Sequence, residues 1–186
     1  MIKLISQRIY LKELERQDCH KLYKATDFDP NTEYQKPLPY SKAAADSWYE
    51  EIVEMQHKKH VRLGIYINDD EVIGDVAIQD IDHEHKHATL GLSINALKHR
   101  NLGYGKEALE RIIKYGFETL KLHRLEAETS SLNKPAQKVL EDLGFHHEGT
   151  KRETIFYRNH YHDTLIYGLL GDAYAQKSKS QSRLTF

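Results

Sequence analysis

Residues 100–105 read Arg-Asn-Leu-Gly-Tyr-Gly and separate two stretches of different hydrophobic period. Before them, residues 88–94 alternate apolar side chains with small or polar ones, which predicts a strand. After them, apolar residues recur at helical spacing from Ala108 to Leu120, which predicts one long helix. Alternation returns at residues 125–129 and indicates another strand. A strand, a glycine-containing loop, a helix and a second strand are therefore expected in direct succession.

The loop at residues 100–105 has the features of an anion cradle. Glycine lets the backbone approach a phosphate closely, and the first turn of the following helix offers unpaired N–H groups and the positive end of its dipole. Arg100 adds a cationic side chain. The simpler interpretation is a loop that needs glycine only for its bends, and the loop by itself does not decide between the two.

Residues 103–108 also fit the dinucleotide-binding pattern G-x-G-x-x-G/A, with Glu126 or Glu128 near the distance expected of a ribose-binding acid. That fold requires a tight turn from the strand into the first glycine, whereas residues 95–102 intervene here. The flanking segments also read as antiparallel hairpins instead of alternating strands and helices. A dinucleotide site is therefore the weaker interpretation.

The remaining pattern indicates a single mixed α/β domain over residues 1–171. The other expected elements are a strand around Ile9 and Leu11, helices at residues 18–26 and after Ser41, a hairpin of residues 61–67 and 72–78, a helix from Asn133 to Gly144, and strands at residues 149–157 and 161–170. Residues 172–186 are rich in Lys, Ser and Gln without an apolar period, so a polar, disordered tail is expected.

Composition narrows the class of partner. The chain has 27 basic and 28 acidic side chains and a formal net charge of -1, so neither nucleic acid nor a membrane is expected as a partner. The single cysteine, Cys19, can form no intrachain disulfide, which favours a reducing, cytoplasmic location. No stretch approaches the length of a membrane span. Monomer and homodimer both remain open.

Arg100, Gly103 and Gly105 fill every required position of a loop of the form Q/R-x-x-G-x-G/A. This loop resembles the phosphate loop of the GNAT superfamily of N-acetyltransferases. The similarity continues through Asn133, residues 143–145, residues 148–149 and residues 161–163. It looks like the RimJ/RimL-like branch of ribosomal-protein-alanine N-acetyltransferases and, more distantly, like spermidine acetyltransferase. The resemblance covers about residues 5–170.

The resemblance implies a GNAT fold, which is a splayed, mostly antiparallel sheet of about seven strands with helices on both faces. It also implies acetyl-CoA as co-substrate and no metal. The pantetheine arm would enter between residues 88–94 and 124–129, where a backbone N–H can stabilise the oxyanion formed when an amine attacks the thioester. The expected coenzyme-binding residues are Leu92, Ser93, Ile94, Arg100, Asn101, Leu102, Gly103, Tyr104, Gly105 and Asn133.

The usual acid and base of the family are missing from this sequence. Thr89 stands where many relatives carry a catalytic carboxylate, Leu140 where many carry a tyrosine, and Ala136 where some carry a serine. Proton transfer is therefore expected to run through water and backbone, or through a side chain that takes over the role. The candidates are Asn133, Ser131, Tyr157 and Asp163. A structural helix cap explains Asn133 equally well, and a turn or substrate-positioning role explains Asp163.

The loop of residues 28–40 is expected to cover the acceptor, with Tyr34, Tyr40 and Tyr161 as substrate contacts. A protein N-terminal α-amine is the first choice of acceptor, and a polyamine or another small amine, including an aminoglycoside, is the alternative. A polyamine site would use carboxylates, which this region offers at Asp27, Asp29, Glu33 and Asp46. A hypothesis of a different class is an acyl-CoA-binding regulatory protein without efficient catalysis.

Residues 83–87 read His-Glu-His-Lys-His and contain the zinc-protease pattern H-E-x-x-H. That pattern binds metal only on a helix, where residues four apart share one face. The run lies between two expected strands, so a solvated hairpin loop is predicted and no metal is assigned.

Overall fold

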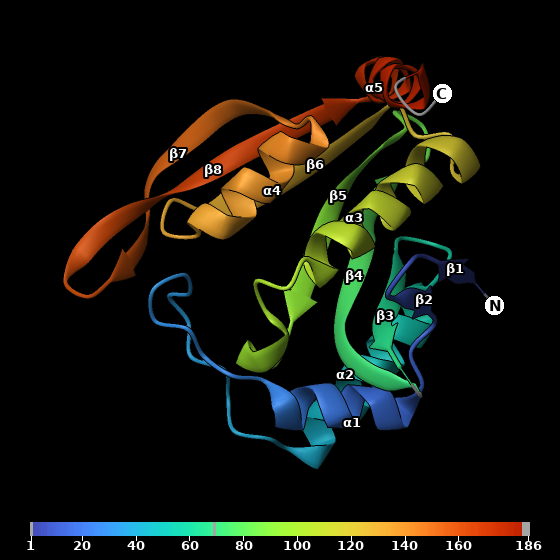
Figure 1. The fold of residues 1–186 in the computed structure, drawn as a ribbon. Helices are drawn as coiled ribbons and strands as arrows, with labels where there is room; N and C mark the ends of the chain where they lie inside the picture. The colour runs from blue at the N-terminus through green and yellow to red at the C-terminus, as the bar shows by residue number, and fades with distance from the viewer. Residues whose placement is uncertain (1, 69, 184–186) are drawn as a thin grey trace.

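The computed structural model describes residues 2–68 and 70–183, and its centre is an eight-stranded sheet in the order β1-β2-β3-β4-β5-β6-β8-β7 (Figure 1). The strands are β1 (Lys3–Ile5), β2 (Tyr10–Lys12), β3 (Val61–Ile67), β4 (Glu71–Asp82), β5 (His87–Ile94), β6 (Arg124–Ser130), β7 (His146–Tyr157) and β8 (His160–Leu170). Neighbouring strands are antiparallel except for β5 and β6, which pair in parallel. The predicted mixed, mostly antiparallel sheet is confirmed, with β1 as one strand more than expected.

Helices cover both faces of this sheet. They are α1 (Arg16–Ala25), α2 (Lys42–Met55), α3 (Tyr104–Lys114), α4 (Lys134–Leu143) and α5 (Gly171–Arg183), with a short 3-10 turn η1 (Leu97–His99) and a π-helical turn η2 (Tyr115–Thr119) that extends α3. Along β3, Ile65 belongs to the hydrophobic cluster that includes Ile112 of α3, whereas Tyr66 belongs to a second cluster with Cys19 of α1 and Ile52 of α2. Since successive strand residues point to opposite faces, the two clusters lie on opposite sides of the sheet.

Local signals in the sequence set the ends of these helices. The Ser41 hydroxyl accepts a hydrogen bond from the Ala44 N–H at the start of α2, and Asn133 Oδ1 accepts from the Ala136 N–H at 3.1 Å at the start of α4. Gly144 ends α4 in the left-handed conformation with φ 97°. These three predicted caps are confirmed, and they follow from the preference of short polar side chains and glycine for such positions.

The expected disordered tail is wrong for residues 172–183, because α5 occupies them. Tyr174 stacks on Phe117 with ring centroids 4.9 Å apart, and its hydroxyl donates to Glu118 Oε1 at 2.9 Å. One aromatic residue that packs on η2 thus anchors a segment whose composition alone indicates disorder. Residues 184–186 lie outside the described part of the chain. Within the described ranges, no helix is long and apolar enough to cross a membrane.

The sheet opens in its middle, between β5 and β6. These strands pair only at one end, through His87, Ala88 and Thr89, and then diverge. β6 continues alongside β8 as far as Ser130, while β5 continues alongside β4 as far as Ile94. In Figure 1 the two strands lie together near α5 and separate toward the loop that precedes α2, with α3 and α4 flanking the opening. The sheet is therefore splayed as predicted.

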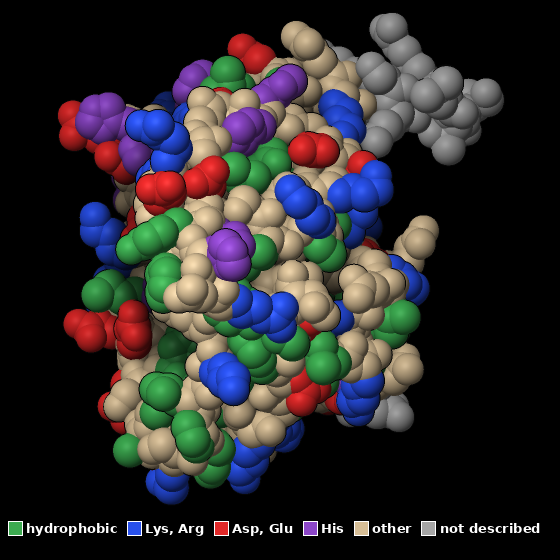
Figure 2. All heavy atoms as spheres, turned by 90° about the vertical axis from the view of Figure 1, so that its left-hand side faces the viewer, with side chains coloured by type: hydrophobic (Ala, Val, Ile, Leu, Met, Phe, Trp, Pro, Cys, Tyr) green, Lys and Arg blue, Asp and Glu red, His purple; other side chains and the backbone are tan. Residues whose placement is uncertain are grey.

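Basic and acidic side chains alternate over the face that carries the outer strands. Figure 2 shows Lys and Arg interspersed with Asp and Glu on this face, without a large area of one sign.

Arg124 of β6 reaches Glu148 of β7 at 2.5 Å, across β8. The carboxylate of Glu148 lies over Gly168, where a Cβ would come within 2.4 Å of it. Gly168 therefore makes room for an ion pair between strands that are not neighbours.

Candidate active site

A cleft of about 380 Å³ occupies the opening between β5 and β6. Of the predicted coenzyme-binding residues, nine line it: Leu92, Ser93, Ile94, Arg100, Asn101, Gly103, Tyr104, Gly105 and Asn133. Leu102 does not line it; this residue is exposed, and its carbonyl accepts a hydrogen bond from Arg8 Nη1 at 2.8 Å. Because pairing to β6 ends at Thr89, the backbone edge of residues 90–94 that faces away from β4 has no strand partner among the described residues. This edge is open to a ligand in the cleft.

The loop before α3 turns its backbone toward the cleft by two left-handed residues. Asn101 has φ 60° and Gly103 has φ 86°, and Gly103 is the N-cap of α3. The first backbone hydrogen bond of the helix runs from the Glu107 N–H to the Gly103 carbonyl at 3.1 Å. The N–H groups of the first turn therefore have no helical acceptor, an arrangement that favours a negatively charged group.

Gly105 allows α3 to lie directly against β5. A Cβ on this residue would stand 3.0 Å from Leu92 Cδ2 and 3.7 Å from Ile94 Cγ1. The glycine thus sets how closely the helix N-terminus and the open strand edge approach each other. Both walls of the cleft depend on this contact.

Arg100 differs from the expected phosphate contact, because its guanidinium is bound by protein groups. Nε donates to the Ile94 carbonyl at 2.7 Å, Nη2 donates to the carbonyls of Asp27 and Asn95 at 3.1 Å each, and Nη1 pairs with Glu33 at 3.0 Å. Its side chain is 17% exposed. The arginine lines the cleft but is held toward the loop that follows α1.

A brace from the N-terminal segment supports the same loop, and no pattern in the sequence indicated it. Arg8 donates from its backbone N and from Nε to the two oxygens of Glu107, at 2.9 Å each. Its guanidinium also lies over the ring of Tyr104, 5.0 Å from the centroid. Glu107 is largely buried in the first turn of α3, where its charge is favoured by the helix dipole. The partners are 99 positions apart in the chain, so neither residue points to the other in the sequence.

A second hollow of about 390 Å³ adjoins the cleft. It shares five lining residues with the cleft, which are Thr32, Glu33, Glu128, Thr129 and Asn133. The remaining lining residues are Tyr34, Gln35, Ser130, Ile155 and Thr164. The hollow therefore lies between the loop after α1 and the strands β6, β7 and β8, beside the expected position of the thioester.

Glu128 is a carboxylate beside the opening that the sequence pattern did not indicate as a candidate base. It lies on β6 beyond the last residue paired with β5, lines both hollows, and its side chain is about half exposed. Oε1 pairs with Lys151 Nζ at 2.5 Å. By the resemblance, a catalytic carboxylate would lie on residues 88–94 of β5, whereas Glu128 lies on β6, on the other side of the opening. The alternation of β6 could have indicated it, since residues 126 and 128 share a face.

Of the four catalytic candidates, only Asn133 lines the cleft and the hollow. Ser131 and Asp163 bind each other across β6 and β8: Ser131 N donates to the Asp163 carbonyl at 2.9 Å, and Asp163 N donates to Ser131 Oγ at 3.2 Å. Asp163 Oδ1 further accepts from Glu153 N at 2.8 Å. Tyr157 donates from its hydroxyl to the Pro30 carbonyl at 3.2 Å, outside both hollows. The last three residues join structural elements in this arrangement.

The expected acid positions are apolar or otherwise occupied, as the sequence indicated. Leu140 and Ala136 line the cleft. Thr89 donates from its hydroxyl to the Gln79 carbonyl at 3.2 Å and to Asp80 Oδ2 at 3.0 Å. None of these three residues therefore supplies an acid or a base.

The three predicted acceptor contacts lie in different places. Tyr34 lines the acceptor-side hollow. Tyr161 lies opposite Phe156 in the β7–β8 pairing, with the rings 5.0 Å apart and Tyr161 63% exposed. The neighbouring pair of Ile155 and His162 faces the other way, and Ile155 lines the hollow. Alternation therefore places Tyr161 on the face away from the hollow, and Tyr161 does not line it.

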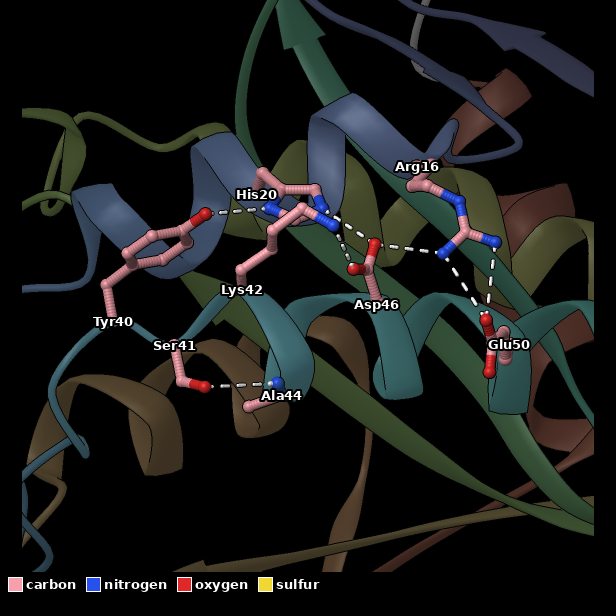
Figure 3. Close-up of polar contacts among 8 residues, drawn as sticks. All are labelled: Arg16, His20, Tyr40, Ser41, Lys42, Ala44, Asp46 and Glu50. Atoms are coloured by element: carbon pink, nitrogen blue, oxygen red, sulfur yellow. Dashed lines mark hydrogen bonds and ion pairs between the residues drawn. The ribbon is translucent and has the colours of Figure 1, made fainter.

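Tyr40 belongs to a polar cluster between α1 and α2, shown in Figure 3. Its hydroxyl bonds His20 Nδ1 at 2.9 Å, and His20 Nε2 contacts Asp46 Oδ1 at 3.0 Å. Asp46 also accepts from Lys42 and Arg16, each at 2.9 Å. Hydrogen bonds from Lys42, Arg16 and His20 hold the pKa of Asp46 well below its usual range. The cluster holds the end of the loop of residues 28–40, here called the acceptor loop after its expected role, and does not line the hollow.

The histidine run at residues 83–87 forms the β4–β5 turn and the first residue of β5, as predicted. Asp82 accepts from the His85 N–H at 2.7 Å and contacts the His85 ring at 3.1 Å. These bonds lower the pKa of Asp82 to about 2. Among the described residues, no group of three or more His, Cys, Asp or Glu side chains is arranged to hold a metal ion.

Known proteins with similar sequences and structures identify the family. The family model of the acetyltransferase (GNAT) domain matches residues 8–146. An N-acetyltransferase of Bacillus licheniformis, itself uncharacterized, is 29% identical over 178 residues, which cover 94% of this chain and 99% of that protein. This relative thus covers nearly the whole chain.

Two solved structures from Vibrio cholerae share the fold. A spermidine N-acetyltransferase in complex with CoA and spermine gives a TM-score of 0.77 at 22% identity, covering 91% of this chain and 99% of that one. A candidate ribosomal-protein-serine acetyltransferase gives 0.73 at 22% identity, covering 91% and 97%. The cleft at the splayed strands, the glycine loop and the match to the family model agree with one another. The chain therefore belongs to the GNAT family of acetyl-CoA-dependent N-acetyltransferases.

Proposed function

We propose that this protein transfers the acetyl group of acetyl-CoA directly to the N-terminal α-amine of a protein. The observation that carries the transfer is the unpaired backbone edge of residues 90–94, which faces the N-terminus of α3 across one cleft. The first-turn N–H groups and the left-handed Gly103 would hold the pyrophosphate. The strand edge would pair with the pantetheine amides, and a backbone N–H at residues 92–94 would face the thioester oxygen.

The acceptor would enter through the hollow that contains Glu128. The attacking nitrogen forms a bond to the thioester carbon, the carbon–sulfur bond breaks, and the amine loses a proton. Glu128 is the carboxylate placed to receive that proton, directly or through water. Asn133 has its Oδ1 bound by the Ala136 N–H, which leaves the amide Nδ2 as a donor for the pantetheine or the departing thiolate.

The charges around the hollow favour an acceptor with a single amine. Glu33 is paired with Arg100 and Glu128 with Lys151, so each carboxylate already has a cationic partner. A polyamine would need several carboxylates without such partners. The open position of the hollow between the loop after α1 and the strands β6, β7 and β8 also suits an extended peptide end.

A polyamine is the second candidate, on a specific observation. Asp29 lines the cleft and accepts only from neighbouring loop groups, the Asn31 N–H at 3.0 Å and the Thr32 hydroxyl at 3.1 Å. These bonds, led by that of Asn31, lower the pKa of Asp29, so its negative charge is retained. A structural relative binds spermine together with CoA.

The test is thiol release from acetyl-CoA in the presence of N-terminal peptides, spermidine, spermine and aminoglycosides. We expect turnover with peptides at a kcat/KM at least tenfold above that with polyamines. Higher turnover with spermidine or spermine would assign the second candidate. Coenzyme binding by calorimetry, with thiol release no faster than without enzyme for every amine, would instead indicate a coenzyme-binding regulatory protein.

A further inference from the structure

The guanidinium of Arg100 uses its donors on protein acceptors. Three of its four contacts are backbone carbonyls. Two belong to Ile94 and Asn95 at the end of β5, and the third belongs to Asp27 in the loop after α1. The fourth contact is the Glu33 carboxylate at 3.0 Å. An arginine has five N–H groups in a fixed planar fork, so at most one is left for a ligand. The Arg100 side chain therefore connects the end of β5 to the loop after α1.

The loop that Arg100 reaches is joined to the coenzyme loop by further bonds. Asp27 N donates to the Asn95 carbonyl at 2.9 Å, and Asp27 Oδ2 accepts from Leu97 N at 2.8 Å. Asn95 Nδ2 donates to Thr26 Oγ1 at 2.7 Å. These contacts fix the beginning of the acceptor loop to the segment that leads from β5 into α3.

Glu33 extends this connection to the part of the loop that lines the acceptor hollow. Oε2 accepts from Asp29 N at 2.7 Å while Oε1 pairs with Arg100, so both oxygens are engaged. Glu33 also precedes Tyr34, which lines the hollow. Moving the Glu33 carboxylate would therefore move the wall of the acceptor hollow.

We propose that Arg100 is a positioning residue for the acceptor, which acts through Glu33, and not a phosphate contact. This inference rests on the proposed acetyl transfer, because it assigns a role within that site. Backbone N–H groups would hold the coenzyme phosphates, and the guanidinium would hold the acceptor loop in place beside them. Loss of the pair should weaken acceptor recognition and leave coenzyme affinity nearly unchanged.

Two variants test the pair from both sides. Glu33→Gln keeps an acceptor for Asp29 N but removes the charge that Arg100 pairs with. Arg100→Lys keeps a positive charge near the cleft but removes the planar fork. The matched control is Glu50→Gln. It breaks a Glu–Arg contact of 3.4 Å between Arg16 of α1 and Glu50 of α2, neither of which lines the cleft. Each protein is measured for acceptor KM, kcat, the dissociation constant for acetyl-CoA, and hydrogen exchange of residues 28–36.

Both variants should raise the acceptor KM about tenfold, as expected for a lost charge-assisted hydrogen bond, while the acetyl-CoA dissociation constant changes less than twofold. Exchange of residues 28–36 should rise in both variants and stay unchanged in Glu50→Gln. A tenfold weaker acetyl-CoA affinity of Arg100→Lys with unchanged acceptor KM would overturn the proposal. Unchanged exchange of residues 28–36 would also overturn it. The exchange and calorimetry results decide even if no amine is acetylated, so failure of the proposed function would be seen separately.

Discussion

The two sides of the opening between β5 and β6 are built from different parts of the chain. The side proposed for the coenzyme, here called the coenzyme side, consists of the backbone of residues 90–94 and the loop at residues 100–105, where Gly103 and Gly105 provide the shape. The side proposed for the acceptor, here called the acceptor side, consists of side chains from five separate segments, the loop at residues 32–35, the end of β6, the cap of α4 at Asn133, β7 and β8. The first is local and made of main chain; the second is assembled by tertiary contacts.

This difference determines how each side should respond to substitution. A main-chain site is disturbed when a new Cβ intrudes but tolerates changes in side-chain polarity. A side-chain site loses its chemistry when one carboxylate or ring is replaced. The acceptor side also depends on contacts between distant segments, such as the bond from Tyr157 to Pro30, which are 127 positions apart. Substitutions can therefore separate coenzyme binding from acceptor chemistry.

The largest effect is expected from Glu128→Gln. Removing the proposed proton acceptor should lower kcat about 100-fold, within the range found for general bases, while acetyl-CoA affinity stays within twofold. The amide keeps the shape of the side chain, so the loss would be chemical. Thiol-release kinetics and calorimetry measure the two quantities.

Glu126→Gln is the control for this substitution. Glu126 lies two residues earlier on the same face of β6, is paired with Thr89 in the sheet, and binds Arg124. Its replacement should leave kcat within twofold. Equal activity of Glu128→Gln and the unsubstituted enzyme would show that water and backbone alone carry the proton.

Gly105→Val should separate the two sides in the opposite sense. A Cβ at this position would lie 3.0 Å from Leu92 Cδ2, so a branched side chain must push α3 away from β5 and displace the helix N-terminus that lines the cleft. We expect acetyl-CoA to bind about tenfold more weakly by calorimetry. Gly149→Val is the control, since a Cβ there meets only Ile166 Cδ1 at an ordinary 3.7 Å. Wild-type affinity of Gly105→Val would mean that the coenzyme does not use this contact.

The fold could be predicted from the sequence because its elements are marked locally. Ser41 and Asn133 cap helices, Gly144 ends one, and the alternation at residues 88–94 fixes a strand. The C-terminal helix was missed because its docking depends on Tyr174 meeting Phe117, a contact between segments that the local composition does not encode. β1 was not distinguished from β2, because the two strands follow each other closely in the chain and are three residues long each.

The site divides in the same way. The loop at residues 100–105 is one continuous motif, and five of its six residues line the cleft. Glu128 was not recognised as a candidate base because its role depends on where β5 and β6 separate, which is a property of the sheet. Tyr161 does not line the hollow because successive residues of β8 face opposite sides of the sheet, and the residue of β8 that lines the hollow is Thr164, three positions further on.

A smaller effect is expected from Tyr34→Ala, compared with Tyr161→Ala. Tyr34 lines the acceptor hollow, so its loss should raise the acceptor KM about fivefold through lost contact area. Tyr161 lies on the opposite face of the hairpin, so its loss should change the acceptor KM less than twofold. Acetyl-CoA affinity should stay unchanged in both. A larger effect from Tyr161→Ala would place the acceptor along the outer face of β7 and β8.

The smallest effect concerns the ionic anchor at the far end of the acceptor loop. The pKa of Asp46 is lower in the folded chain than in the unfolded chain, because Lys42, Arg16 and His20 bond its carboxylate (Figure 3). A lowered folded pKa gives stability that is present above the unfolded value of about 3.9 and is lost as the pH falls through the folded value. Asp46→Asn should therefore lower Tm at pH 7 by about 2 °C.

The pH dependence of that difference identifies its origin. Thermal unfolding of both proteins between pH 7 and pH 2 should show the difference in Tm shrinking below about pH 4, because the unfolded chain then binds a proton that the folded carboxylate does not. The side chain of Glu50 is 67% exposed, and its contact with Arg16 is long, at 3.4 Å. Glu50→Gln should therefore leave Tm almost unchanged at any pH. A Tm difference for Asp46→Asn that did not shrink between pH 4 and pH 2 would mean that packing, and not charge, holds Tyr40 and this end of the loop of residues 28–40.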